Sequence, residues 1–396
     1  MWVRVPPAHH LRWTFVGHDP NEGHLDELAQ PAPIARLVGF DGLRAVAALS
    51  IFAYHFSINV VFWSSSYELF DVLNQLRVGV WVFFVVSGFL LYRPYVAALR
   101  KAAGGPRLGT YARHRFLRLF PAYFVALVLL TYVFHKTHSQ DFSSFLTQLG
   151  LLQIYVRSEL LLGIDVTWSL ATEVSFYIFL PCYAALIAVL SRGKRVLAVE
   201  TGGLLFLVIV GLVWQIVSNG HVLQSTWLPS FLPVFAAGMT LAVIKEHAPA
   251  NMRGLCSFVE RHGLLCWGTA AALLIVKGLT APTIGFEHGF AIGPQTIFTA
   301  VALLVVAPCA LATPEARTVR VLDWRPLQLV GVVSYGLFLW HVSIIRWVQL
   351  EWIPSENPMF ARNLVVFVVS LVVTLAVATA SWMAVERPML RLAHRR

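Results

Sequence analysis

Long apolar runs alternate with shorter polar segments along most of this chain. Each run is about 20 residues long, which suits a helix that crosses the hydrocarbon layer of a membrane. Backbone polar groups in that layer must be satisfied within the segment itself, so each run is expected to be helical. The pattern predicts an all-α polytopic membrane protein with about ten transmembrane helices. The runs span residues 38–58, 76–93, 117–135, 168–190, 197–217, 228–244, 263–280, 293–312, 329–348 and 362–385.

Composition and charge add an orientation to this pattern. The chain is 58% hydrophobic and only 13% charged, about half the charged share of soluble domains. Of its 30 lysines and arginines, 23 lie in the two tails and in every second loop between the runs. Because basic residues concentrate on the cytoplasmic side of membrane proteins, both termini are predicted to be cytoplasmic. The same bias accounts for the net charge of +10 without an acidic partner, and nucleic acid is not expected.

The domain plan that follows has one membrane domain, at residues 38–388. Residues 1–37 are polar and contain several prolines, so they are predicted to form a partly disordered cytoplasmic tail. Residues 389–396 form a short basic tail on the same side.

The first predicted helix carries charged and titratable residues into the membrane. Arg44 and His55 are eleven residues apart, so they project from nearly the same helix face with a rise of roughly 16 Å between them. Asp41 lies near the start of the same stripe. Ionisable groups in a membrane usually face a cavity or a water path. A functional stripe is therefore predicted; the alternative is a buried ion pair and a hydrogen-bonded core histidine.

Two further clusters contain small or basic residues. Ser87 and Gly88 in the second run allow the close approach of a ligand or, alternatively, of another helix. Arg115 and Arg118 lie one turn apart where the third run begins, with Arg113 before them and Tyr123 after them. Arginines can bind phosphates through forked hydrogen bonds. They can equally serve as topology signals or contact lipid headgroups.

Two more clusters combine polar and aromatic residues. In the fourth run, Glu173 has Tyr177 one turn later on the same face and Trp168 before it. A functional buried carboxylate is one interpretation, and a glutamate favoured by the dipole at a helix start is the other. The ninth run contains Ser334, Tyr335 and His341. His341 is either part of the site or a polar contact between helices. No histidine spacing here is typical of a metal site, so no metal is expected.

Taken together, these motifs resemble the membrane-bound acyltransferase-3 family, the O-acyltransferases of envelope and antibiotic sugars. The resemblance rests on six motifs that occur in the family's order and span nearly the whole chain after residue 37. They are DGLRAVAAL at 41–49 with His55, FFVVSGFLL at 83–91, RFLRLFPAY at 115–123, WSLATEVSFY at 168–177, SYGLFLWH at 334–341 and ERP at 386–388.

The resemblance implies an acyl-CoA-dependent O-acyltransferase of the EC 2.3.1 type in a bacterial inner (plasma) membrane. It implies transfer of an acyl group from cytoplasmic acyl-CoA, such as acetyl-CoA or succinyl-CoA, to a hydroxyl of a carbohydrate or glycolipid. No permanently bound cofactor is expected. His55 and Arg44 are the residues it implicates in catalysis, His55 either as general base or as transient acyl carrier.

The other candidate site residues are expected to orient His55, to contact the acyl donor or to line the substrate site. Glu173 is expected to lie beside His55 and to orient its imidazole. The donor is expected to contact Arg113, Arg115, Arg118, Tyr123, Ser87 and Gly88, and Asp41, Trp168, Tyr177, Ser334, Tyr335 and His341 are expected to line the substrate site or support it. The competing interpretation is a transporter or flippase of a lipid-linked glycan, since polar groups inside a membrane suit such a pathway too.

Overall fold

The computed structural model describes residues 38–61, 67–135, 141–160, 162–192, 195–247, 252–280, 292–352 and 360–393. The predicted N-terminal tail at 1–37 and the last three residues of the predicted C-terminal tail lie outside this part of the chain. All regular structure in the described residues is helical. The helices are α2 (Phe40–Phe56), α3 (Tyr67–Asn74), α4 (Gly79–Arg100), α5 (Leu108–Val128), α6 (Phe142–Leu149), α7 (Thr167–Leu190), α8 (Val196–Val217), α9 (Val222–Ser225), α10 (Leu228–His247), α11 (Arg253–Arg261), α12 (Gly263–Thr280), α13 (Ile292–Ala310), α14 (Arg317–Leu322), α15 (Arg325–Val332), α16 (Ser334–Trp347), α17 (Phe360–Ser381) and α18 (Arg387–Ala393).

The predicted fold class is confirmed. Within the described residues, nine helices are long and apolar enough to cross a membrane. A tenth span is formed if the helix pair at 325–332 and 334–351 is counted as one. This protein is therefore a multi-pass membrane protein, with its spans in the ten predicted places. The cytoplasmic placement of both termini stays a prediction.

The third span begins earlier than its apolar run. It was predicted at 117–135, but the helix starts at Leu108 and the span continues to Val133. The reason is that arginine is a good helix former, so the basic stretch before residue 117 continues the helix instead of ending it. Arg113, Arg115 and Arg118 consequently project from a helix and take different directions around it.

The ninth span is broken, whereas one continuous helix was predicted. Helices α15 and α16 meet at Val333 and are bent by 73° relative to each other. Helix α15 packs against α2, where a Cβ on Gly331 would lie 1.9 Å from the carbonyl oxygen of Asp41. The break directs the first residues of α16 toward α2 and α5.

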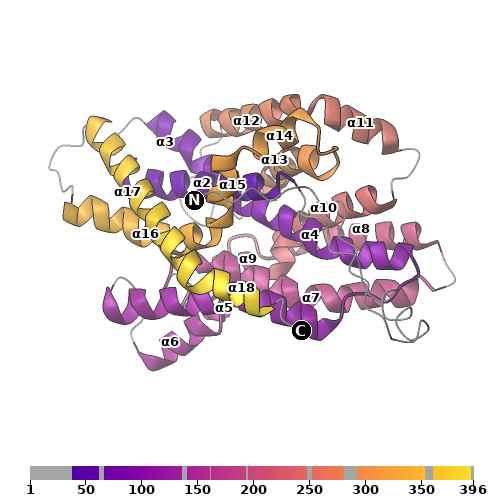
Figure 1. Cartoon of the computed structure of the whole chain (residues 1–396), viewed down its shortest axis with the longest axis horizontal. Helices are drawn as coiled ribbons and strands as arrows, with labels where there is room; N and C mark the ends of the chain where they lie inside the picture. The colour runs from indigo at the N-terminus through magenta and orange to yellow at the C-terminus, as the bar shows by residue number, and fades with distance from the viewer. Residues whose placement is uncertain are drawn as a thin grey trace, which may run out of the picture. The chain divides into compact units, whose positions relative to one another are not determined.

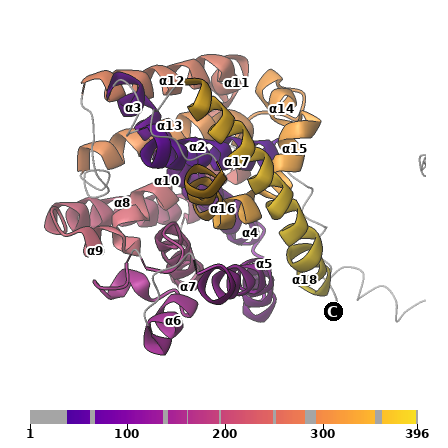
Figure 2. The same cartoon turned by 90° about the vertical axis from the view of Figure 1, so that its left-hand side faces the viewer.

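Helices α2, α4 and α10 lie between two groups of helices, α11–α14 and α5–α7 (Figures 1 and 2). Helix α4 packs most extensively against α10. At their crossing, a Cβ on Gly88 would lie 2.3 Å from the carbonyl oxygen of Phe235, and one on Gly238 would lie 2.0 Å from that of Val85. The two backbones are therefore in direct contact, and the glycines make that contact possible.

Candidate functional site

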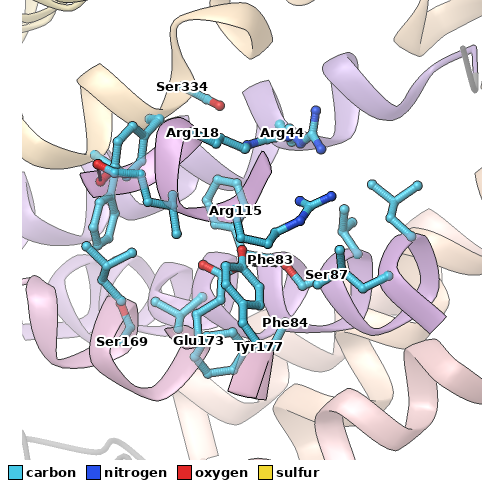
Figure 3. Close-up of a pocket in the computed structure, with 18 of the residues that line it drawn as sticks. Arg44, Phe83, Phe84, Ser87, Arg115, Arg118, Ser169, Glu173, Tyr177 and Ser334 are labelled. Carbon is cyan, nitrogen blue, oxygen red and sulfur yellow. Dashed lines mark hydrogen bonds between the residues drawn. The ribbon is translucent and has the colours of Figure 1, made fainter. Parts of the chain in front are cut away.

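A cavity opens between five helices. Helices α2, α4, α5, α7 and α16 each contribute side chains to its walls. Figure 3 shows Arg44 and Arg118 on one side, Glu173 and Tyr177 on the other, and Arg115 between them. The break at Val333 brings the start of α16 into the wall. The polar residues that line the cavity are Arg44, Ser87, Arg115, Arg118, Ser169, Glu173, Tyr177, Ser334 and Tyr335.

The carboxylate of Glu173 is held by two hydroxyl groups. Ser87 Oγ donates to its Oε1 at 2.5 Å, and Tyr177 Oη donates to the same oxygen at 2.7 Å. The bond from Tyr177 follows from the i, i+4 spacing on α7, whereas the bond from Ser87 connects α7 to α4. Glu173 therefore has a fixed position in the wall and an acceptor oxygen that is already occupied.

Three arginines face this single carboxylate. Arg44 donates to Asp41 Oδ1 at 3.2 Å, one turn earlier on α2. The guanidinium carbon of Arg115 lies 5.9 Å from the ring centre of Tyr111 and 5.8 Å from that of Tyr177. Arg118 completes the group on the next turn of α5. Asp41 pairs with Arg44, and Glu386 lies within electrostatic reach of Arg118. The cavity wall itself holds three guanidinium groups and one carboxylate, and it therefore suits an anionic ligand.

His55 lies one helical turn beyond the cavity wall. The lining residue nearest to it in sequence is Ile51 on α2, and the lining residue Phe338 on α16 lies three residues before His341. Its imidazole is paired with His341, whose Nε2 is 3.0 Å from Nδ1 of His55, and the ring centres are 4.8 Å apart. Two titratable rings thus meet about one helical turn beyond the lining residues Ile51 and Phe338.

The predicted pairing of Glu173 with His55 is wrong. Glu173 binds Ser87 and Tyr177, and the partner of His55 is His341. The prediction placed Glu173 by its depth along α7, but its contacts are set by which residue of α4 packs opposite, and that residue is Ser87. Arg44 lines the cavity and His55 lies one helical turn beyond its wall on the same helix, and the functional role of this stripe stays a prediction.

Other predicted site residues lie away from the cavity walls. Gly88 packs against α10, and Arg113 donates to the carbonyl oxygen of Leu392 at 2.6 Å. Tyr123 is fully buried and donates to the carbonyl oxygen of Gln148 at 2.6 Å, so it connects α5 to α6. The ring of Trp168 packs 5.8 Å from that of Phe231 on α10. These four residues make structural contacts and do not line the cavity.

Several residues of the wall were not predicted. Ser169 lies one turn before Glu173, and Phe338 lies one turn after Ser334, so both share a helix face with a predicted residue. This spacing of one helical turn could have predicted that both residues line the same site. Phe83 and Phe84 stand in the same motif as Ser87, and their place in the wall depends on how α4 is rotated.

Fold and site together define a membrane-embedded acyltransferase domain. Residues 37–383 match the family model described as acyltransferase domain, and the chain belongs to the acyltransferase-3 family. This membership confirms the resemblance that the six motifs indicated.

Named relatives are distant in sequence. The chain is 25% identical over 369 residues to YrhL of Bacillus subtilis (strain 168), described as a candidate peptidoglycan O-acetyltransferase; the match covers 88% of this chain and 54% of YrhL. It is 24% identical over 379 residues to the O-acetyltransferase OatA of Staphylococcus aureus (strain NCTC 8325 / PS 47), and the match covers 89% of this chain and 57% of OatA. The chain thus spans little more than half the length of these two relatives. Nodulation protein 10 of Rhizobium leguminosarum bv. viciae is 24% identical to this chain over 353 residues, and the match covers 82% of this chain and 84% of that protein. No solved structure matches the chain.

Proposed function

We propose that this protein transfers an acyl group from acyl-CoA to a hydroxyl of a carbohydrate, as an O-acyltransferase of the bacterial cytoplasmic membrane. The observation that carries the proposal is a cavity lined by three arginines, with a pair of histidines about one helical turn beyond its lining residues Ile51 and Phe338. Such a cavity offers an anion site and a proton acceptor within one helical bundle, and the family supplies the reaction class.

The donor is assigned to the arginine-lined part of the cavity. Acyl-CoA carries several phosphates, and arginine binds phosphate through two parallel charge-assisted hydrogen bonds. Arg115 and Arg118 on α5 would hold these phosphates. The thioester arm would extend past Arg44 and Ile51 toward His55, along the stripe on α2. Arg44 is then placed to stabilise the negative charge that develops on the thioester oxygen.

His55 is assigned as the general base. Its imidazole takes the proton from the acceptor hydroxyl while the hydroxyl oxygen forms a bond to the thioester carbon. The carbon–sulfur bond then breaks, and the departing thiolate receives that proton to leave as the thiol of coenzyme A. The imidazole returns to its neutral form, and the acyl group ends as an ester on the acceptor.

An envelope polysaccharide or glycolipid is the proposed acceptor class, and acetyl the first acyl group to test. The support is that OatA is named an O-acetyltransferase and that YrhL is described with peptidoglycan as its substrate. A transporter or flippase of a lipid-linked glycan is the competing function, and it would need no acyl donor.

The direct test is turnover by the purified full chain in detergent or liposomes. Radiolabelled acetyl-CoA and succinyl-CoA are supplied in turn with envelope glycans, and transfer of label to the carbohydrate is expected with one of them. Label that stays on the protein when no acceptor is present would identify His55 as an acyl carrier instead of a base. Movement of glycan across liposomes without any transfer of label would contradict the proposal in favour of transport.

The arginine assignment predicts a change in donor affinity. Arg118→Ala is expected to raise the KM for acyl-CoA about tenfold or more, because a hydrogen bond to a charged group contributes about 1.5–3 kcal/mol. Steady-state kinetics with varied acyl-CoA measures it. Arg113→Ala is the matched control on the same helix, since Arg113 contacts the Leu392 carbonyl and not the cavity. Equal KM values in the two variants would place the phosphates elsewhere.

A further inference from the structure

We propose that His341 is a positioning residue that keeps the ring proton of His55 on Nδ1, so that Nε2 of His55 is the atom that accepts the proton. This inference rests on the proposed function for its consequence in turnover. Its evidence, however, is the hydrogen-bond geometry of the two rings alone, which can be measured without any substrate.

The proton position on His341 follows from its own helix. Nδ1 of His341 lies 3.0 Å from the carbonyl oxygen of Leu337 and 2.8 Å from that of Phe338. A carbonyl oxygen can only accept a hydrogen bond, so Nδ1 of His341 must carry the proton. In the neutral ring, Nε2 of His341 then has a lone pair and can only accept.

The proton position on His55 follows from that of His341. Nδ1 of His55 lies 3.0 Å from Nε2 of His341 and 3.0 Å from the carbonyl oxygen of Ile51. Both neighbours are acceptors, so Nδ1 of His55 must be the donor to both. Its Nε2 is then the nitrogen with the free lone pair, and no residue in the described ranges forms a hydrogen bond with it.

His341 is held firmly enough to impose this arrangement. Its side chain has no exposed surface, and its ring lies 6.3 Å from those of Phe52 and Phe338. His55 is only partly buried, with Tyr54 against its other side at 4.7 Å. The buried ring therefore orients the accessible one, as the carboxylate orients the histidine in a serine–histidine–aspartate triad.

The backbone of His55 is held by contacts that run from the π-helical turn after α2 (Ser57–Val61) to α16. Asn59 donates from Nδ2 to the carbonyl oxygen of His55 at 2.7 Å, and Arg346 donates from Nε to Asn59 Oδ1 at 3.1 Å. Arg346 also pairs with Asp165 at 2.6 Å. The only charged groups in this chain of contacts, Arg346 and Asp165, thus balance each other, and the histidine pair needs no net charge of its own.

The test reads the ring protons directly. The purified full chain, labelled with ¹⁵N-histidine, is examined by solid-state NMR in lipid bilayers, because protonated and unprotonated ring nitrogens differ in chemical shift. His55 signals are assigned by their loss in His55→Ala. The expected spectrum has a protonated Nδ1 and an unprotonated Nε2 in His55, with a through-space contact to His341. A protonated Nε2 in neutral His55 would overturn the proposal whatever the enzymatic activity.

Two variants connect this geometry to turnover. His341→Phe keeps the ring but removes the acceptor, and we expect it to lower kcat about 10- to 100-fold with little change in KM. The loss should be smaller than the roughly 10⁴-fold effect of a wrong tautomer in a serine protease, because the Ile51 carbonyl still accepts from Nδ1. His341→Gln, whose amide oxygen can accept the same bond, should recover much of the lost kcat.

The outcomes separate this inference from the proposed function. If His341→Phe retains the wild-type kcat and the Nδ1 proton of His55, His341 has no positioning role, although acyl transfer by His55 stands. If the wild-type chain transfers no acyl group to any acceptor, the proposed function fails, while the NMR result still decides the proton position.

Discussion

Replacing His55 with alanine is expected to lower kcat for acyl transfer by about 10²–10⁴-fold, the usual contribution of a general base. His55 lies one helical turn beyond the lining residue Ile51 and is only partly buried, whereas its partner His341 is fully buried. The measurement is the rate of labelled acyl transfer by purified protein. Gel filtration in detergent checks that the variant is folded and monodisperse.

A second histidine provides a matched control for this prediction. His262 lies between α11 and α12, is exposed, and places Nδ1 3.0 Å from the carbonyl oxygen of Phe258, four residues earlier. This copies the local contact between His55 and Ile51 at a position away from the cavity. His262→Ala should keep the wild-type rate. Wild-type turnover by His55→Ala would remove His55 from the chemistry.

The largest expected effect on stability is at the crossing of α4 and α10. Gly238→Ala would place a Cβ 2.0 Å from the carbonyl oxygen of Val85, which is backbone and cannot rotate away. The two helices must separate to admit the methyl group, and overpacking of this kind typically lowers the free energy of unfolding by about 1–3 kcal/mol. Thermal unfolding in detergent, followed by the loss of monodisperse protein, measures it.

The control for Gly238 is a glycine with free space around it. A Cβ on Gly202, an exposed residue of α8, meets no atom within 4 Å. Gly202→Ala should be neutral or raise stability by up to about 1 kcal/mol, because alanine is the better helix former. Equal melting temperatures for the two variants would show that α4 and α10 are not in backbone contact.

Much of the fold could be predicted from hydrophobic runs, because a membrane requires each apolar span to satisfy its own backbone hydrogen bonds. The ten spans were found for that reason, including the one that is bent. The bend at Val333 was not predicted, although Gly331 and Gly336 flank it, because glycines within an apolar run occur in continuous membrane helices too. It arises where α15 packs against α2 while α16 continues beside α17.

Part of the candidate site could be predicted in the same way. Residues that share one helix face stay together in the fold, so the spacing of Arg44 and His55 places both on one face of α2, with Arg44 in the cavity wall and His55 one turn beyond it. The same rule paired Glu173 with Tyr177. Contacts between helices could not be predicted from spacing within one helix, because they depend on the rotation and the relative height of both helices.

The sequence by itself determined which segments are helices in a membrane, which family the chain resembles and which helix faces are polar, since all of these are local properties of short stretches. Only the tertiary structure decided that Ser87 binds Glu173, that Arg113 points away from the cavity, and that His55 meets His341. Each of these depends on packing between residues that are 86, 279 and 286 positions apart. No periodicity within one helix contains that information.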